Sequence, residues 1–400
     1  MNILYISYAY PVGGKGLYGD LGEALAEKGH NVKVVVSNTK IVEPTKIISQ
    51  NGVEILCVKT APLFNIGKIK KAISILTLPG KFKNAIRKHY INESFDLILF
   101  EAPPISLVNV VKWAKRTFNC PAFVQQKDIF PENVADLNLI SRKSPIYGFF
   151  RRMEINMLST ADYIGYMSNG NRKFLLEHNV FLSPNKCVYF PNSMKISEFP
   201  EKNRRAEICE KLKIVQDSCI LLFGGNIGHV QCVDFLCKLL IHFKGNSKVY
   251  FLVIGNGIFE KKVISAIADN KISNAQYISS IPRDEYNDIA NHCDVGLIIV
   301  DPRFTIPNYP SKTLGYMHSG IPILAATDLN TDYRNLIEDE AKCGLWAHSG
   351  DFAAFVAKLE TIAENPQLRQ ELGQNGRQYL EKYFDVQDSV NVLEELFSEK

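Results

Sequence analysis

The chain has 400 residues, of which 46% are hydrophobic and 22% charged, values that are ordinary for globular proteins and exclude disordered or fibrous ones. A chain of this length exceeds what one hydrophobic core usually serves and predicts two domains. The net charge of +4 is too small to indicate nucleic acid as a partner.

Short apolar runs alternate with longer amphipathic ones from the start of the chain. In the first half we predict helices over 20–28 and 108–117, and strands at 3–7, 32–37, 53–58, 97–100 and 122–125. Alternation of this kind predicts a parallel sheet with helices on both faces.

The same pattern begins again after a polar stretch at 192–205. Strands are expected at 220–223, 249–254, 276–278, 295–300 and 321–325, with helices between them at 232–243, 259–269, 284–292 and 312–318. We therefore predict an α/β protein of two doubly wound, Rossmann-like domains, residues 1–193 and 194–400, which face each other across a cleft lined by the carboxyl ends of both sheets. An amphipathic helix at 386–397 either caps the second domain or returns to the first.

The first half is basic. Residues 1–200 contain 25 Lys and Arg against 15 Asp and Glu, a balance of +10, which leaves −6 for residues 201–400. Two segments interleave cations with apolar residues, and from these we single out Lys70, Lys71, Lys81, Lys83, Arg142, Lys143, Arg151 and Arg152. Such segments suit the headgroup region of an anionic bilayer, although a helix with a solvated basic face has the same pattern.

Nothing in the sequence predicts secretion or membrane crossing. The first ten residues lack the basic and long apolar regions of a signal peptide, and no run approaches the roughly 18 apolar residues of a spanning helix. The nine cysteines form no C-x-x-C pair, so we interpret them as reduced core residues of a cytosolic protein. The histidines show no metal-ligand spacing, and no metal is expected.

Two glycine-rich turns each follow the first strand of a predicted domain. The first contains Gly13, Gly14 and Lys15, and the second Gly225, Asn226, Gly228 and His229. Glycines between a strand and a helix let backbone N–H groups approach a phosphate. Either turn alone is equally consistent with a plain loop, but the pair favours a ligand with a diphosphate. Gly255 belongs to a tight turn after a third strand, which we expect to line the same pocket.

Three charged residues are candidates for chemistry. Asp128 and Glu132 follow a buried strand of the first domain, where a carboxylate can accept a proton from an attacking hydroxyl; capping of the next helix is the alternative. Ser311 is predicted to cap a helix that has Lys312 in its first turn. Because acidic residues are usual at that position, the lysine indicates a bound anion nearby.

These pieces, in this order, resemble the family-four glycosyltransferases of the GT-B fold over nearly the whole chain. The resemblance is carried by Tyr10-Pro11 with Gly13-Gly14, by G-H-N-V at 29–32, by P-N-S at 191–193, by G-N-I-G at 225–228, by G-N-G at 255–257 and by Y-P-S-K at 309–312. The D-I-F-P-E run at 128–132 is similar to that of enzymes that build bacterial surface polysaccharides, such as O-antigen or capsule.

The resemblance implies a retaining transferase that needs no metal or other cofactor. It would move a hexosyl or N-acetylhexosaminyl group from a nucleotide-diphosphate sugar, expected to be a UDP-sugar, to an acceptor hydroxyl. The donor would bind mainly to the second domain. The acceptor, a polyprenyl-diphosphate-linked glycan, would bind to the first at the inner face of the cytoplasmic membrane, with the protein peripheral to it.

The sequence departs from the family pattern at several of its functional positions. The two glutamates of the family's E-x7-E motif fall on Pro307 and Gly315. The Arg and Lys that usually flank the donor phosphates fall on Asn226 and Gln231, and we hypothesise that Lys312 and His229 compensate.

Two alternatives remain open. One is a nucleotide-sugar epimerase of the same fold, which would convert a donor without any acceptor. The other is a non-catalytic homologue that binds nucleotide sugar or membrane within an assembly; the missing glutamates favour it.

Overall fold

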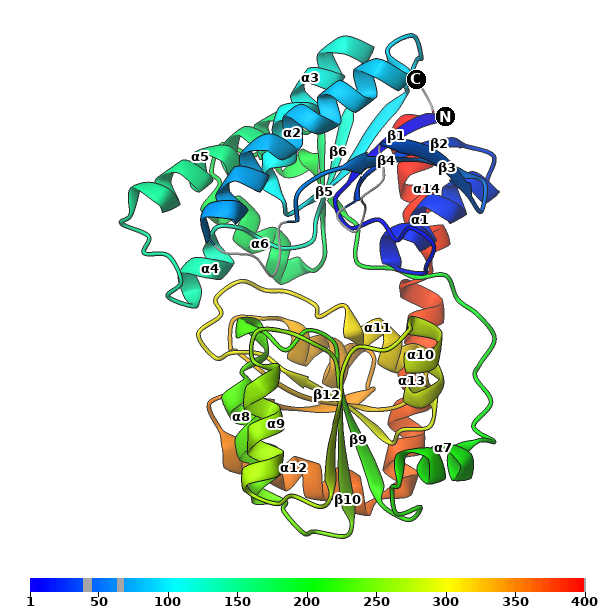
Figure 1. Ribbon diagram of the computed structural model, residues 1–400, viewed down its shortest axis with the longest axis vertical. Coiled ribbons are helices and arrows are strands. Elements are labelled where there is room, and N and C mark those ends of the chain that lie inside the picture. Colours follow the sequence, from blue (N-terminus) through cyan, green and yellow to red (C-terminus); the bar gives the residue numbers. More distant parts are fainter. Residues whose placement is uncertain (39–44, 63–67, 399–400) are drawn as a thin grey trace. The chain divides into compact units, whose positions relative to one another are not determined.

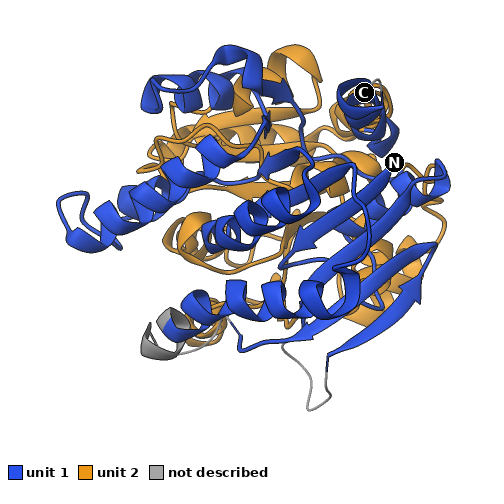
Figure 2. Ribbon diagram, turned by 90° about the horizontal axis from the view of Figure 1, so that it is seen from above, with its two compact units in different colours: residues 1–195, 385–400 blue, residues 196–384 orange. Residues whose placement is uncertain are grey.

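The computed structural model describes residues 1–38, 45–62 and 68–398, without the side chains of residues 68–72 (Figure 1). The chain forms two compact units (Figure 2). Unit 1 comprises Met1–Lys195 and Asp385–Lys400, and unit 2 comprises Ile196–Phe384. The break lies two residues beyond the sequence-based boundary, and the last segment belongs to unit 1 and not to the second domain.

Unit 1 is built on a sheet with the strand order β3-β4-β2-β1-β5-β6-β7-β8. Every pairing is parallel except β3 with β4, which forms an antiparallel edge. The strands are β1 (Asn2–Ser7), β2 (Asn31–Asn38), β3 (Lys46–Gln50), β4 (Val53–Lys59), β5 (Leu97–Ala102), β6 (Ala122–Gln126), β7 (Tyr163–Tyr166) and β8 (Cys187–Tyr189). The sequence did not predict β3, β7 or β8, because these strands are only five, four and three residues long and partly exposed.

The helices of unit 1 include one from the far end of the chain. They are α1 (Leu17–Glu27), α2 (Lys68–Tyr90), α3 (Val108–Phe118), α4 (Glu132–Asp136), α5 (Pro145–Thr160), α6 (Asn169–His178) and α14 (Val386–Phe397), with 3-10 turns η1 (Ile105–Leu107) and η2 (Pro184–Lys186). Helix α14 packs beside α1 (Figure 1). Its buried residues Val386, Val390, Leu393 and Phe397 recur at one-face spacing and join the core beneath β1 and β2.

Unit 2 has a wholly parallel sheet with the order β11-β10-β9-β12-β13-β14. The strands are β9 (Cys219–Gly224), β10 (Val249–Ile254), β11 (Ala275–Ile278), β12 (Val295–Ile299), β13 (Ile323–Thr327) and β14 (Gly344–His348). The helices are α7 (Arg205–Leu212), α8 (Val233–His242), α9 (Glu260–Asp269), α10 (Arg283–Asn291), α11 (Lys312–His318), α12 (Phe352–Glu364) and α13 (Pro366–Tyr383), with a 3-10 turn η3 (His229–Gln231) and a π turn η4 (Asn335–Glu340).

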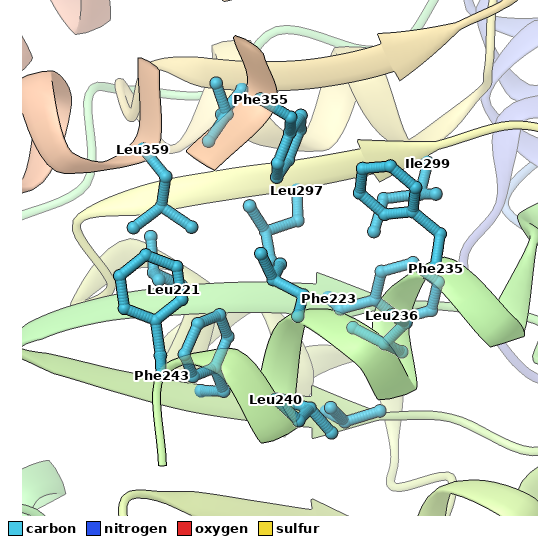
Figure 3. Packing of buried hydrophobic residues seen from close by; sticks show 14 of the residues in the cluster. Leu221, Phe223, Phe235, Leu236, Leu240, Phe243, Leu297, Ile299, Phe355 and Leu359 are labelled. Atoms are coloured by element: carbon cyan, nitrogen blue, oxygen red, sulfur yellow. The ribbon is translucent and has the colours of Figure 1, made fainter. Parts of the chain in front are cut away.

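The core of unit 2 holds β9 and β12 in place. Figure 3 shows side chains of these two strands packed against α8 and α12; the labelled residues are Leu221, Phe223, Leu297, Ile299, Phe235, Leu236, Leu240, Phe243, Phe355 and Leu359. Burying each such side chain contributes about 1.5–3 kcal/mol. The carboxyl ends of both strands are therefore fixed by rigid packing.

Each sheet reverses its winding direction once. In unit 1 the chain runs from β1 outward through β2 to β4 and β3, then returns to β5 on the other side of β1. In unit 2 it runs from β9 outward through β10 to β11, then returns to β12 on the other side of β9. Ligands of open α/β sheets bind at the carboxyl end of such switch points, so these two edges are where a site is expected.

Candidate functional site

The second glycine turn lies at the switch point of unit 2, directly after β9. It packs backbone to backbone against the turn after β10, since Ile227 N donates to Asn256 O at 2.8 Å. A Cβ atom on Gly255 would lie 1.8 Å from Gly225 O, and one on Gly257 would lie 2.3 Å from Ile227 O. Glycine is therefore required where the two turns meet.

Most N–H groups of this turn are already used within unit 2. Gly224 N donates to Tyr316 Oη, and Gly225 N donates to Ile254 O. Ile227 N donates to Asn256 O, and Gly228 N donates to Gln231 Oε1. Helix α8 begins at Val233, after the η3 turn and one residue beyond the predicted start at 232. The N–H of Asn226 is the one in 224–228 that makes no hydrogen bond to described residues.

Lys312 is the buried cation of this edge. Its Nζ has no hydrogen-bond partner in the described part of the chain and lies 4.3 Å from the centre of the Phe223 ring, on β9. Burial lowers the pKa of Lys312 to about 8. Ser311 precedes α11 but makes no capping hydrogen bond with its side chain. A buried ammonium without a counter-ion is costly, so an anion bound here would stabilise it.

A second cation beside the turn was not found in the sequence. Asp301, just after β12, accepts hydrogen bonds from Arg303 Nε at 2.8 Å and Nη2 at 2.7 Å. The backbone N–H of Asp301 donates to Val230 O in η3. This bond brings Arg303 to the same loop as His229. The ring of His229 lies edge-on to Phe259, with 4.8 Å between centroids. The signal would have been the D-P-R run after a predicted strand.

Glu101, at the end of β5, organises the switch point of unit 1, and the sequence reading missed it as well. Its Oε1 accepts hydrogen bonds from Ser7 Oγ at 2.8 Å, Tyr8 N at 2.8 Å and Ala9 N at 3.0 Å. Its Oε2 is buried without a partner among the described residues, and burial raises the pKa of Glu101 to about 7. A carboxylate inside an otherwise apolar strand was the available signal.

Asp128 follows β6, next to Glu101 on β5. The backbone N–H of Lys127 donates to Ala102 O at 3.0 Å, which sets the two strand ends side by side. Asp128 Oδ2 accepts from Asn133 Nδ2 at 2.6 Å, while Oδ1 has no partner in the described chain. Burial raises the pKa of Asp128 to about 6 and lowers that of Lys127 to about 7. Groups with pKa values near neutrality suit proton transfer.

Glu132 has a different environment from Asp128. Its Oε2 accepts from Arg142 Nε at 3.0 Å, and its Oε1 accepts from the Tyr147 hydroxyl and lies 3.2 Å from His178 Nε2. Burial acts to raise the pKa of Glu132, but the contacts with His178 and Arg142 outweigh it, and the pKa is lowered. Both oxygens thus hold the segment after α4 in place, and Asp128 is the better placed of the two predicted catalytic carboxylates.

The first glycine turn lies at the start of α1. Gly13 has φ +69° and donates its N–H to Gln50 Oε1 at 2.7 Å. Helix α1 begins at Leu17, three residues before the predicted start, and no side chain caps it. The first N–H groups of a helix lack intrahelical partners, so this turn, which also carries Gly14 and Lys15, suits an anion.

Two of the predicted membrane-facing cations have partners inside unit 1. Arg142 bonds Glu132 and also Asp136, at 2.5 Å. Arg151 donates to the buried Glu154 at 2.8 Å and to Asn179 Oδ1 at 2.7 Å. Buried carboxylates therefore pair with both arginines, and the idea that these two residues face a membrane stays a prediction.

Other members of that set remain available on the surface. Lys143 is exposed just before α5 and Arg152 is exposed midway along it; the same helix exposes Ile146 (60%) and Phe149 (48%). On α2, Lys81 is exposed and Lys83 Nζ lies 5.4 Å from the Trp113 ring centre. The side chains of Lys70 and Lys71 lie outside the described ones.

Membrane-spanning helices and metal clusters were sought in the described residues. No helix there is long and apolar enough to cross a bilayer. No group of three His, Cys, Asp or Glu side chains in the same residues is arranged to hold a metal ion.

Sequence comparison relates part of unit 2 to a known family. Residues 204–379, less than half of the chain, match the model of the family described as Glycosyl transferases group 1. A probable glycosyltransferase of Pseudomonas aeruginosa, WbjE, is 24% identical over 238 residues, which cover 59% of this chain and 58% of that protein. The chain therefore aligns with less than two thirds of that relative's length.

Solved structures resemble the whole chain. Sucrose-phosphate synthase from Thermosynechococcus elongatus has a TM-score of 0.79 at 16% identity, with both chains covered completely. Anabaena HepE in complex with UDP-glucose has a TM-score of 0.72 at 14% identity, again over both full chains. WaaG, a glycosyltransferase involved in lipopolysaccharide biosynthesis, has a TM-score of 0.69 at 16% identity over 98% of this chain and 99% of its own. These likenesses confirm the predicted GT-B fold of two Rossmann-like domains.

Proposed function

We propose that the protein is a retaining glycosyltransferase that moves a hexosyl or N-acetylhexosaminyl group from a UDP-sugar to a lipid-linked glycan in surface polysaccharide biosynthesis. Proteins of similar structure support this choice, since HepE binds UDP-glucose and WaaG is involved in lipopolysaccharide biosynthesis. The proposal assigns the donor to unit 2 and the acceptor to unit 1.

The observation that carries the proposal is the buried, unpartnered ammonium of Lys312 at the switch point of unit 2. A diphosphate bound beside it gains negative charge as the glycosidic bond breaks. A fixed cation in a site of low polarity then stabilises the transition state more than the ground state. Arg303 and the N–H of Asn226 are further donors of the same loops.

Asp128 is the group of unit 1 that we assign to the acceptor. Its raised pKa of about 6 leaves it ionised at neutral pH, and its free Oδ1 can accept the proton of an attacking hydroxyl. Glu101 is a positioning residue in this scheme, because it fixes the turn after β1 by three hydrogen bonds.

The exposed face of α5 is our candidate for membrane contact. Lys143 and Arg152 flank the exposed Ile146 and Phe149, a combination that suits anionic headgroups above acyl chains. The proposal places the protein on the inner face of the cytoplasmic membrane, where a polyprenyl-diphosphate acceptor is displayed.

A thermal-shift panel of nucleotide sugars tests donor binding, because a ligand of the folded state raises its apparent stability. We expect UDP-sugars to raise the melting temperature of the protein and to do so less in Lys312→Met. Incubating the best donor alone, and then with membrane extract, separates the three functions. Conversion without extract indicates an epimerase, and binding without any transfer a non-catalytic homologue; either result contradicts the proposal.

A further inference from the structure

A cavity of about 540 Å³ opens at the opposite edge of the unit 2 sheet from Lys312. It lies at the amino ends of β12 and β13, since Asp294 and Pro322 directly precede these strands. It is lined by Phe199, Lys202, Arg205, Asn291, His292, Cys293, Asp294, Gly320, Ile321, Pro322, Pro366, Arg369, Gln370 and Gln374. Its volume falls within the roughly 300–1,000 Å³ of small-molecule sites.

The charges of this cavity do not balance. Arg205 is paired with Asp294 through a 2.8 Å contact. Arg369 donates to two backbone carbonyls, and its Nε lies 3.9 Å from the same carboxylate. Lys202 donates to Gly320 O at 3.1 Å and has no carboxylate within ion-pair distance in the described chain. The lining thus holds three cations and one carboxylate, Asp294, which leaves a surplus of two positive charges.

His292 adds no charge to this count. Its Nδ1 lies 2.7 Å from Asp288 O and donates to it, while its Nε2 accepts from the backbone N–H of Arg204 at 3.2 Å. This pattern fixes the neutral tautomer of the ring. The charge surplus therefore rests on Lys202 and Arg369.

The surplus charge is partly withdrawn from water. Partial burial lowers the pKa of Lys202. The ring of Phe199 covers Gly320, where a Cβ would lie 2.6 Å from it. The surplus positive charge of this cavity attracts an anion.

We propose that this cavity binds the phosphate monoester of a small molecule, as a second site distinct from the sheet edge that holds Lys312. A phosphate monoester carries close to two negative charges at neutral pH, which matches the surplus. The cations come from three separate elements, namely the 196–204 segment, α7 and α13. A phosphate group has three acceptor oxygens, with which cations from different elements can pair.

The position of the cavity gives such a ligand a structural effect. Phe199 and Lys202 belong to the segment that enters unit 2 after Lys195, whereas Arg369 and Gln374 belong to α13. A phosphate bridging Lys202 and Arg369 ties the entering segment to α13 and so stabilises unit 2.

The test is a thermal-shift titration of the full chain with glucose 6-phosphate, with glucose and sodium sulfate at equal ionic strength as reference ligands. We expect a saturable rise in melting temperature at millimolar glucose 6-phosphate, absent with glucose and smaller with sulfate. Lys202→Met should weaken the apparent affinity at least tenfold. Lys312→Met should leave it unchanged, which separates this site from the proposed donor site.

Gln374→Glu provides a variant that keeps the fold, since Gln374 is exposed at the rim of the cavity. The added negative charge should weaken binding, whereas Gln367→Glu, exposed on the same helix but outside the lining, should not. The absence of a saturable shift, an equal shift with sulfate, or equal affinity of Gln374→Glu and Gln367→Glu would overturn the proposal.

Discussion

The carboxyl edges of the two sheets differ in the kinds of groups that they carry. At the switch point of unit 1, buried side chains with pKa values near neutrality gather, namely Glu101, Lys127 and Asp128. At the switch point of unit 2, two glycine turns pack backbone to backbone, and one buried ammonium stands beside them. Under the proposed function, the same topology serves proton transfer in one unit and anion binding in the other.

This difference determines which kind of substitution disrupts each edge. In unit 1 the chemistry resides in single side-chain atoms, so a substitution that preserves shape removes it. In unit 2 the binding surface depends on the close approach of two backbones, so adding one methyl group disturbs it. Substitutions in the two edges should accordingly change different measured quantities.

The largest effect is expected from Asp128→Asn. The amide keeps the shape and the contact with Asn133 but cannot accept a proton, so kcat for transfer should fall by about 10²–10⁴-fold. The affinity for UDP-sugar, measured by titration, should stay within about twofold of the original.

The pH profile sharpens this prediction. Because the base must be ionised, kcat/KM should fall as the pH drops through about 6, the pKa of Asp128. Glu101→Gln keeps an acceptor for the turn after β1 and should retain this acid limb. A limb that moves with Glu101 and not with Asp128 would reverse the assignment.

Lys312→Met should separate binding from stability. Loss of a charged hydrogen-bond donor to a diphosphate costs about 1.5–3 kcal/mol, so the KM for the donor should rise at least tenfold. The free protein should nevertheless become more stable at pH 7, because the variant removes a buried charge without a partner.

The pH dependence of stability provides the control. The pKa of Lys312 falls from 10.5 to about 8 on folding, so the unfolded state binds more protons between these values and stability rises with pH across that window. Lys312→Met should lack this rise in urea unfolding. A variant that loses stability at pH 7 would show that Lys312 has a structural partner.

A smaller effect is expected from Gly255→Ala. The new Cβ would meet Gly225 O, and φ of +154° is unfavourable for alanine, so unit 2 should lose about 1–3 kcal/mol of stability. Gly14→Ala, in the first glycine turn, meets nothing within 4 Å and should be close to neutral. Urea unfolding of both variants tests whether the backbone contact is as tight as the structure indicates.

The sequence predicted those features of the two units that depend on the local pattern of residues. Alternating apolar runs were sufficient for the two parallel sheets, and the position of Asp128 after a strand was sufficient to place it at a sheet edge. Glu101 and Arg303 were missed because their importance depends on which strand ends become neighbours. The ion pairs of Arg142 with Glu132 and of Arg151 with Glu154 were missed for the same reason, because these partners come together only once the chain has folded.

The smallest effect is expected on the surface of α5. Each cation near an anionic bilayer contributes about 1 kcal/mol, so Lys143→Glu and Arg152→Glu should each weaken binding to vesicles containing anionic lipid by about fivefold or more. Lys173→Glu is the matched control, because Lys173 is 77% exposed on α6 and away from Ile146 and Phe149. Co-sedimentation with anionic and neutral vesicles measures the effect. Equal losses from all three variants would mean that the overall charge of unit 1, and not the face of α5, attracts the membrane.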